Sequence, residues 1–306
     1  MKVSIATPAT TDIPRGILYM VLSTMMFGVV NGLVKWELAI YPVGEVAFFR
    51  TLFALIPILA LILPRRGLAV LRTERFGDHF RRAASQLGSM TCLFVAFKLM
   101  PLAGATAISF AAPLITTLLS ILLLKEAVGL HRWLALVIGF LGVLIVTQPG
   151  IGDFQWGGLF ALGNAVLIST VAIAIRRMSL TESSDTLIVY QLTLLVPLSA
   201  LLLLFGFEAP SPPDFLLLLM AGIGNGVAQF WWTKSLHLAP ASAVTPFNYL
   251  ALIWAMIVGY VVWGDVPGRD LLIGSAIVAG SGLYLLWREA ARRAPAVAPA
   301  KATIAQ

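Results

Sequence analysis

The stretch FKLMPLAGATAIS (97–109) has a counterpart in TKSLHLAPASAVT (233–245), and the two align without gaps at a shift of 136 residues. The alignment brings Lys98 onto Lys234 in the middle of otherwise apolar surroundings. An apolar alphabet produces chance matches of alanine and leucine, whereas matched lysines together with matched helix-end acids and prolines are rare by chance. The pair of segments therefore predicts that the second half of the chain repeats the first.

Composition places both halves in a membrane. Of the 306 residues, 59% are hydrophobic and 11% are charged, whereas soluble domains carry about 25% charged residues. A helix needs about 20 apolar residues to cross the hydrocarbon core. Apolar runs that approach or reach this length lie at about 16–36, 43–63, 83–100, 102–124, 131–148, 157–176, 186–207, 214–236, 241–263 and 270–287. A shift of 140 aligns Pro57 of the second run with Pro197 of the seventh. The predicted fold is an all-α membrane protein of ten transmembrane helices in two five-helix repeats.

The distribution of lysine and arginine predicts how the repeats are oriented. An odd number of helices makes the second repeat enter the membrane from the opposite side, so the repeat is inverted. Cytoplasmic loops carry an excess of basic residues. Six arginines share the loop between the second and third runs: Arg65, Arg66, Arg72, Arg75, Arg81 and Arg82. Alternate counting from this loop places 17 of the 21 basic residues on its side and three opposite, namely Lys35, Lys98 and Arg269. Both termini are therefore predicted to be cytoplasmic.

These observations divide the chain and limit its partners. The net charge of +7 lies in short loops rather than on one face, so we expect membrane lipids and a small-molecule substrate as partners, with no nucleic acid and no obligatory protein. No small-residue cleavage pattern follows the first run, which predicts an uncleaved first helix. The predicted parts are a polar N-terminal segment (1–14), a first repeat (15–148), a periplasmic linker (149–156), a second, inverted repeat (157–288) and a disordered cytoplasmic tail (289–306).

Polar side chains inside spans are costly, so they are the candidates for a substrate site. In the eighth run, Asn225, Gln229 and Trp232 recur at helical spacing and fall on one face. They either line a substrate cavity, or the two amides bond to neighbouring helices and Trp232 anchors the membrane interface. The remaining candidates for substrate binding are Asn31, Gln86, Asn164, Asn248 and Tyr249.

Arg50 is the permanently charged residue predicted deep in a span, about 12 Å from the start of its helix. It can pair with a substrate carboxylate, with carbonyls at a broken helix end, or with Glu45. We favour a structural or gating role for this charge, which Lys35 and Glu45 share near the outer helix ends. Prolines inside spans break backbone hydrogen bonds and are candidate hinges or fixed kinks. They are Pro57, Pro113, Pro197 and Pro246.

The predicted spans lack acids in their middle, and the chain lacks the common catalytic motifs. All 14 Asp and Glu are predicted in loops or near helix ends, which favours facilitated transport over proton coupling. The sequence Gly150-Ile-Gly-Asp153 resembles an intramembrane protease motif, but it lies in a predicted loop without the partner Tyr-Asp. The chain has no HExxH, GxSxG or Walker loop and a single cysteine, Cys92. We therefore expect no enzyme, no cofactor and no metal site.

A family resemblance rests on these features taken together. The duplicated unit, the run PLAGATA (101–107), Glu126 and the step Gly139-Phe-Leu-Gly142 resemble the EamA-type drug/metabolite transporters over residues 14–288. The resemblance implies a ten-helix carrier in a bacterial inner membrane that exports amino acids, aromatic ones and other neutral ones, by alternating access. The alternatives are a proton-coupled exporter of nucleobases or drug-like metabolites, or a membrane-embedded enzyme or scaffold.

Overall fold

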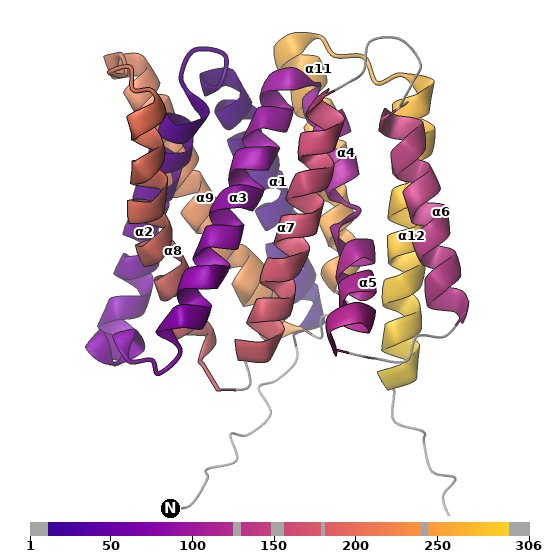
Figure 1. Cartoon of the computed structure of the whole chain (residues 1–306), viewed down its shortest axis with the longest axis horizontal. Helices are drawn as coiled ribbons and strands as arrows, with labels where there is room; N and C mark the ends of the chain where they lie inside the picture. The colour runs from indigo at the N-terminus through magenta and orange to yellow at the C-terminus, as the bar shows by residue number, and fades with distance from the viewer. Residues whose placement is uncertain (1–11, 125–129, 148–155, 179–180, 240–243, 294–306) are drawn as a thin grey trace, which may run out of the picture.

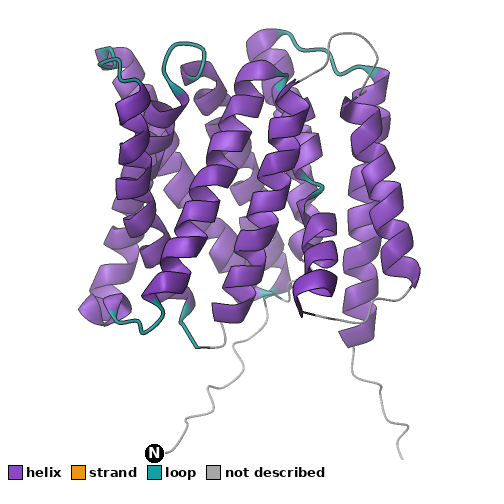
Figure 2. Cartoon of the chain, viewed as in Figure 1, coloured by secondary structure: helices purple, strands orange, loops and turns teal. Residues whose placement is uncertain are grey.

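The computed structural model describes residues 12–124, 130–147, 156–178, 181–239 and 244–293, and the regular structure in these ranges is entirely helical (Figure 2). The first half contains α1 (Ile13–Glu37), α2 (Val43–Arg66), η1 (Gly67–Leu71), α3 (Phe76–Leu99), α4 (Leu102–Ser109), α5 (Ala112–Leu124) and α6 (Leu130–Thr147). The second half contains α7 (Trp156–Met178), α8 (Ser184–Ala200), η2 (Leu201–Phe205), α9 (Pro212–Leu238), η3 (Thr245–Tyr249), α11 (Leu250–Trp263) and α12 (Arg269–Arg293).

Local sequence explains where several helices begin and end. Side chains cap the first turns of α1, α8 and α9, where Asp12, Ser183 and Ser211 each accept a hydrogen bond from a backbone N–H three residues on. Proline occupies the first turn of α1 and of α9, where its missing N–H costs nothing. At the end of α11, Gly264 adopts a left-handed conformation (φ 70°) that terminates the helix.

The helices have the lengths and composition of membrane spans. Six of them are long and apolar enough to cross a bilayer, and α4 with α5 and α6 are shorter apolar helices. Counting η1 with α2, α4 with α5, η2 with α8 and η3 with α11 gives ten helical units within the described ranges. The six candidate spans are Ile13–Glu37, Val43–Pro64, Trp156–Ile175, Asp185–Phe205, Pro212–Leu236 and Pro246–Trp263. The predicted multi-pass helical fold is confirmed.

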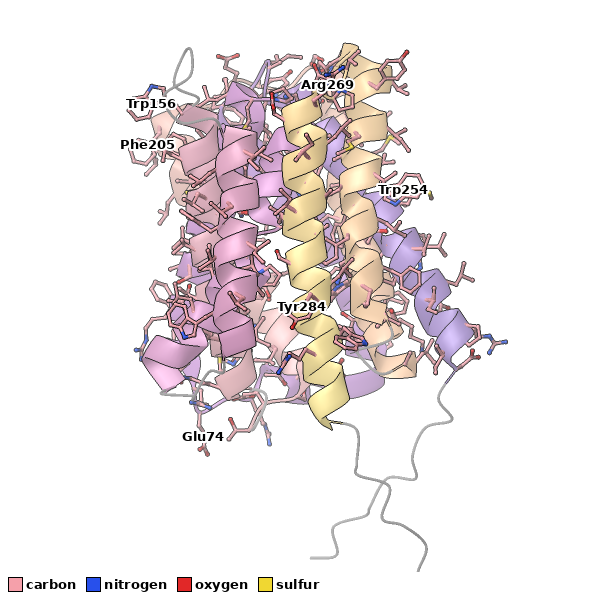
Figure 3. All side chains as sticks on the ribbon, turned by 90° about the vertical axis from the view of Figure 1, so that its right-hand side faces the viewer. Glu74, Trp156, Phe205, Trp254, Arg269 and Tyr284 are labelled. Carbon is pink, nitrogen blue, oxygen red and sulfur yellow. The ribbon has the colours of Figure 1, made fainter. Side chains whose placement is uncertain are left out.

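The two ends of the bundle can be distinguished. The described chain begins and finishes at the same end, from which α1 starts and where α12 ends (Figure 1). Glu74 lies at this end, and Trp156 and Arg269 lie at the opposite one (Figure 3). Since α1 starts at one end and α7 at the other, the two halves run in opposite senses. We call the end with Arg269 the outer end and the end with Glu74 the inner end, after the predicted orientation.

Helix packing follows the approximate twofold symmetry of an inverted repeat. The symmetry exchanges α1 with α7, α2 with α8, α3 with α9 and α6 with α12. The contact of α1 with α9 is matched by that of α7 with α3, and both are extensive. The pairs α2 with α8 and α6 with α12 are their own counterparts and lie on opposite sides of the bundle (Figure 1). Contacts between helices of different halves therefore join the two five-helix units.

The fourth and ninth units differ from the continuous runs predicted at 102–124 and 241–263. The chain leaves the helix at Phe110 and Ala111, between α4 and α5, and η3 precedes α11 in the equivalent part of the second half. Pro113 and Pro246 therefore lie in the first turns of α5 and η3, where proline is tolerated. Pro57 and Pro197 lie inside α2 and α8, as the sequence predicts.

Other boundaries also differ from the apolar runs. The third helix begins at Phe76 rather than near residue 83, and its first turns bury His79 and Arg82. The Nη2 of Arg82 donates to the carbonyl oxygen of Leu187, whereas its buried Nε–H has no hydrogen-bond partner. Helix α12 continues to Arg293, so the first residues of the predicted tail are helical. Most of the predicted linker (149–155) and the rest of the tail lie outside the described residues.

Glycines allow close approach between the halves. A Cβ atom on Gly28 would lie 2.6 Å from the Cβ of Trp254, and one on Gly32 would lie 2.6 Å from a methyl of Val258. Both partners belong to α11, which packs along α1. Small residues that are four positions apart in sequence have this packing role in membrane helices.

Candidate functional site

Arg50 joins three helices in the middle of the bundle. Its Nη2 donates to Oδ1 of Asn225 on α9 over 2.7 Å, and its Nη1 lies 3.3 Å from Sδ of Met90 on α3. The guanidinium stands over the ring of Phe94, 5.4 Å from the ring centre. The Nε–H is buried and has no hydrogen-bond partner. The amide of Asn225, the sulfur of Met90 and the ring of Phe94 thus surround the positive charge, and the Nε–H donor of Arg50 remains unused.

Pairing with Glu45, one of the three possibilities that the sequence left open for Arg50, is not found. Oε2 of Glu45 accepts from the backbone N–H of Glu208 at 2.9 Å instead. Among the described residues, the ion pairs do not include Arg50. A guanidinium with an unused donor and no carboxylate can bind a carboxylate or carbonyl oxygen of a solute.

The polar face predicted on α9 is divided between two environments. Asn225 bonds to Arg50, whereas Trp232 packs against the buried cluster of Met20, Ala239 and Val244. Gln229, between them, is half-buried. Trp232 therefore belongs to the inner packing between α1 and α9 rather than to the surroundings of Arg50.

Asn164 is engaged in packing between the halves. Its Nδ2 donates to the backbone oxygen and to the hydroxyl of Ser89 at 3.0 and 2.8 Å, and the Ser89 hydroxyl lies 3.4 Å from the Asn164 carbonyl oxygen. The amide nitrogen and the backbone carbonyl oxygen of Asn164 thus join α7 to α3. Gln86 on α3 and Asn31 on α1 are half-buried.

A stacked aromatic pair joins the two interrupted units. The rings of Phe110 and Tyr249 lie 4.9 Å apart at 29°. Phe110 occupies the break between α4 and α5, and Tyr249 is the last residue of η3, next to the half-buried Asn248. The Tyr249 hydroxyl is buried without a hydrogen-bond partner. Phe110 was not predicted as a site residue. The shift of 136 aligns it with Pro246, which was predicted as a hinge in the second half.

Phe110 links the apolar surroundings of the Arg50 group to those of Tyr249, because it packs against both of their hydrophobic clusters. Met90 and Phe94 are buried members of the largest hydrophobic cluster, and Phe110 packs against the same cluster. Together they place a cation, an amide, a thioether and stacked rings along one interior. We define the candidate site as Arg50, Asn225, Met90, Phe94, Phe110 and Tyr249. Sequence reasoning identified the polar members and Tyr249, but not Met90, Phe94 or Phe110, because apolar residues fill every span.

Lys35 fastens the outer end of α3. Its Nζ donates to the carbonyl oxygens of Phe97 and Met100 at 2.9 and 2.6 Å and lies 5.4 Å from the ring centre of Trp263. A lysine suits this place because the last carbonyls of a helix carry partial negative charge. A cavity of about 370 Å³ opens nearby, between the outer parts of α4, α6, α11 and α12, and includes Asp265. None of the predicted binding residues lines this cavity.

Tyr41 links the α1–α2 turn to α9 at the outer end. Its hydroxyl donates to Oδ2 of Asp214 at 2.7 Å and accepts from the backbone N–H of Ser211 at 3.1 Å. The Ser211 N–H lowers the pKa of the Tyr41 hydroxyl, whereas the bond to Asp214 and burial raise it, and the net change is a rise. Tyr41 therefore stays a donor. We call this group the outer latch.

Arg75 forms a similar link at the inner end. Its Nη1 donates to the hydroxyl of Thr181 at 3.0 Å, and its Nε donates to Asp78 at 3.0 Å. We call this group the inner latch. The shift of 140 carries Tyr41 onto Thr181, and the shift of 136 carries Asp214 onto Asp78. The two latches are symmetry-related positions of one duplicated unit.

Comparison with known proteins agrees with this architecture. The EamA-like transporter family matches residues 14–148 and 155–288. A riboflavin transporter of Vibrio cholerae is 30% identical over 89% of this chain and 92% of its own length. An S-adenosylmethionine uptake transporter of Rickettsia prowazekii is 26% identical over 80% and 83%, and a pseudopaline exporter of Pseudomonas aeruginosa is 25% identical over 86% and 93%.

A solved crystal structure also shares the fold. It is 21% identical, covers 92% of this chain and 100% of its own, and superposes with a TM-score of 0.63. The duplicated match agrees with the two halves described above. The chain is a multi-pass protein of the bacterial inner membrane, and it belongs to the EamA-like transporter family.

Proposed function

We propose that this protein carries a flat, ring-bearing polar solute of the riboflavin type across the inner membrane. The observation that carries the proposal is the 30% identity to riboflavin transporters of Vibrio cholerae and Rhizobium johnstonii over 89% and 92% of this chain. These relatives favour a larger heterocyclic solute over the simple amino acids that the family resemblance suggested.

The candidate site has the chemistry that such a solute requires. Phe110 and Tyr249 offer aromatic faces where the two interrupted units meet, and stacking on them is worth about 0.5–1.5 kcal/mol beyond burial. Arg50 supplies a donor without a partner, and Asn225 supplies an amide. Rings would bind at the aromatic pair and carbonyl oxygens at the guanidinium.

Amino acids remain a second candidate because of Arg50. Its guanidinium has no carboxylate partner among the described residues, so the carboxylate of an aromatic amino acid would complete its coordination. Export of such amino acids is the function that the family resemblance implies. The two candidates differ in whether a ring or a carboxylate dominates recognition.

Alternating access is the transport mechanism that we propose. Two inverted halves can exchange conformations, which opens a central site to each side in turn. The outer and inner latches are suited to closing the two ends, and Pro57 and Pro197 interrupt the second helix of each half. Opening one end would break one latch while the other remains formed.

The test is transport by purified protein in liposomes. Vesicles loaded with labelled riboflavin should release or exchange it faster than protein-free vesicles, whereas parallel vesicles loaded with S-adenosylmethionine or phenylalanine define specificity. Phe110→Ala should lower riboflavin flux more than phenylalanine flux, and Arg50→Gln should affect phenylalanine flux most. Flux of phenylalanine alone would favour the second candidate, and no flux of any of the three solutes would contradict both.

A further inference from the structure

Glu37 occupies an unusual position for a carboxylate. It is the last residue of α1, its side chain is fully buried, and neither carboxyl oxygen has a hydrogen-bond partner. Burying an ionised carboxylate without partners costs several kcal/mol, and the group avoids this cost by taking up a proton. A negative charge on Glu37 would therefore need a basic group close to the carboxyl group to stabilise it.

The charged groups around Glu37 are negative. Asp214 on α9 and Glu45 on α2 both repel a charge on its carboxyl group, and Glu208 acts on Glu45 in the same corner. Lys35, two residues earlier on α1, is engaged with the end of α3. Tyr41 donates its hydroxyl to Asp214. No basic group therefore compensates the Glu37 carboxyl in this part of the described structure.

Helix geometry distinguishes Glu37 from Glu45. Glu37 ends α1, where the helix carries partial negative charge that disfavours an anion. Glu45 lies in the first turn of α2, where the partial charge is positive, and one of its oxygens accepts from the N–H of Glu208. The two acids flank the same turn and both are buried, but Glu45 has a hydrogen bond to one carboxyl oxygen and lies at the favourable end of a helix, whereas Glu37 has neither.

Glu37 also lies directly beneath the outer latch. The backbone N–H of Tyr41 donates to the carbonyl oxygen of Glu37 at 2.8 Å, and the Tyr41 hydroxyl closes the outer end onto Asp214 and Ser211. Leu38 and Leu218 are fully buried at this end. Release of Tyr41 from α9 would admit water to the Glu37 carboxyl group.

We propose that Glu37 is a proton-binding site, occupied while the outer end is closed and vacated when the outer latch opens. A proton needs only one carboxyl group, and the described residues contain no group of three His, Cys, Asp or Glu that could hold a metal ion. Coupling of this proton to solute movement rests on the proposed function. Such coupling would make transport proton-dependent. This differs from the facilitated transport that the sequence favours because its acids lie in loops or near helix ends.

The binding site can be tested without any solute. Infrared spectroscopy of the purified protein at neutral pH should show the carbonyl stretch of a protonated carboxylic acid. Glu37→Gln should remove this band, since glutamine imitates the neutral acid and preserves folding, which a single symmetric peak in size-exclusion chromatography would verify. Glu208→Gln is the matched control, because it removes an exposed acid from the same corner and keeps the N–H that binds Glu45. An unchanged band in Glu37→Gln would overturn the proposal.

Coupling is tested in liposomes with the membrane potential clamped. If one proton exchanges for one riboflavin, a gradient of one pH unit should drive about tenfold accumulation in the wild-type protein. Glu37→Gln should equilibrate riboflavin without accumulation, whereas Glu208→Gln should accumulate it as the wild type does. Accumulation by Glu37→Gln would refute coupling through this residue. An absence of riboflavin flux in every protein would refute the proposed substrate, and the infrared result would still decide the proton site.

Discussion

Arg50 and Asn225 are 175 residues apart in sequence, yet Nη2 of one lies 2.7 Å from Oδ1 of the other. The bond joins α2 of the first half to α9 of the second. It holds the charge of Arg50 inside the bundle without a carboxylate, which is the arrangement of a cation that can still accept a solute.

Asn225→Leu should destabilise the protein by about 1.5–3 kcal/mol, because it leaves a buried guanidinium donor without its acceptor. Asn225→Asp should preserve or raise thermal stability, because it provides an ionised acceptor, and should lower flux by pairing with Arg50. Melting in detergent and flux in liposomes measure the two effects. Equal melting of Asn225→Leu and wild type would show that Asn225 does not support Arg50.

Tyr249 provides a comparison of ring and hydroxyl. Tyr249→Phe removes a hydroxyl that has no partner and keeps the stacked ring on Phe110, so flux and stability should be unchanged or slightly raised. Tyr249→Ala should raise the KM for riboflavin roughly tenfold, as expected for loss of about 1.4 kcal/mol of stacking and burial. A large defect in Tyr249→Phe would instead assign the hydroxyl a direct role.

The latches should control which end opens. Tyr41→Phe removes two hydrogen bonds, together worth about 1–3 kcal/mol, and should favour opening of the outer end. In a Cys92→Ala background, Leu218→Cys at the outer end should then react faster with an impermeant thiol reagent. Arg75→Gln should favour opening of the inner end and make Val189→Cys react faster. Val189 lies among the residues packed between α2, η1 and α8 near the inner end. Identical labelling with intact and altered latches would show that neither controls access.

Asn164 should behave as a structural residue. Asn164→Leu breaks its bonds to Ser89 and should lower stability by about 1–3 kcal/mol, while the KM of the remaining folded protein stays unchanged. Melting temperature and KM measured on the same preparation separate these effects. A raised KM at normal stability would return Asn164 to the substrate site.

The glycines of the α1–α11 contact can be tested against a control in the same chain. Gly28→Ala would place a Cβ atom 2.6 Å from Trp254 and should destabilise the protein, whereas Gly280 on α12 has no atom within 4 Å of such a Cβ. Gly280→Ala should be neutral or stabilising by about 0.5–1 kcal/mol, because alanine loses less backbone entropy in a helix. Equal melting of both variants would contradict close packing at Gly28.

The sequence by itself determined the features that depend on local pattern. Apolar runs established the number of helical units, the shifted lysines and prolines revealed the duplication, and an odd number of helices in each half required inversion. The acids that the structure describes lie in loops or near helix ends, as the sequence predicts. Each of these follows from hydropathy and counting along the chain, because the bilayer imposes the same requirement on every span.

Tertiary structure alone decided what the polar residues do. Asn164 and Asn225 look alike in sequence, but packing brings one against Ser89 and the other against Arg50. The interruptions at Phe110 and η3 and the burial of Glu37 were also invisible, since both depend on helices distant in sequence. The physical reason is that a hydrogen bond or a desolvated carboxyl requires atoms within a few ångströms, and this proximity is set by how the two halves pack.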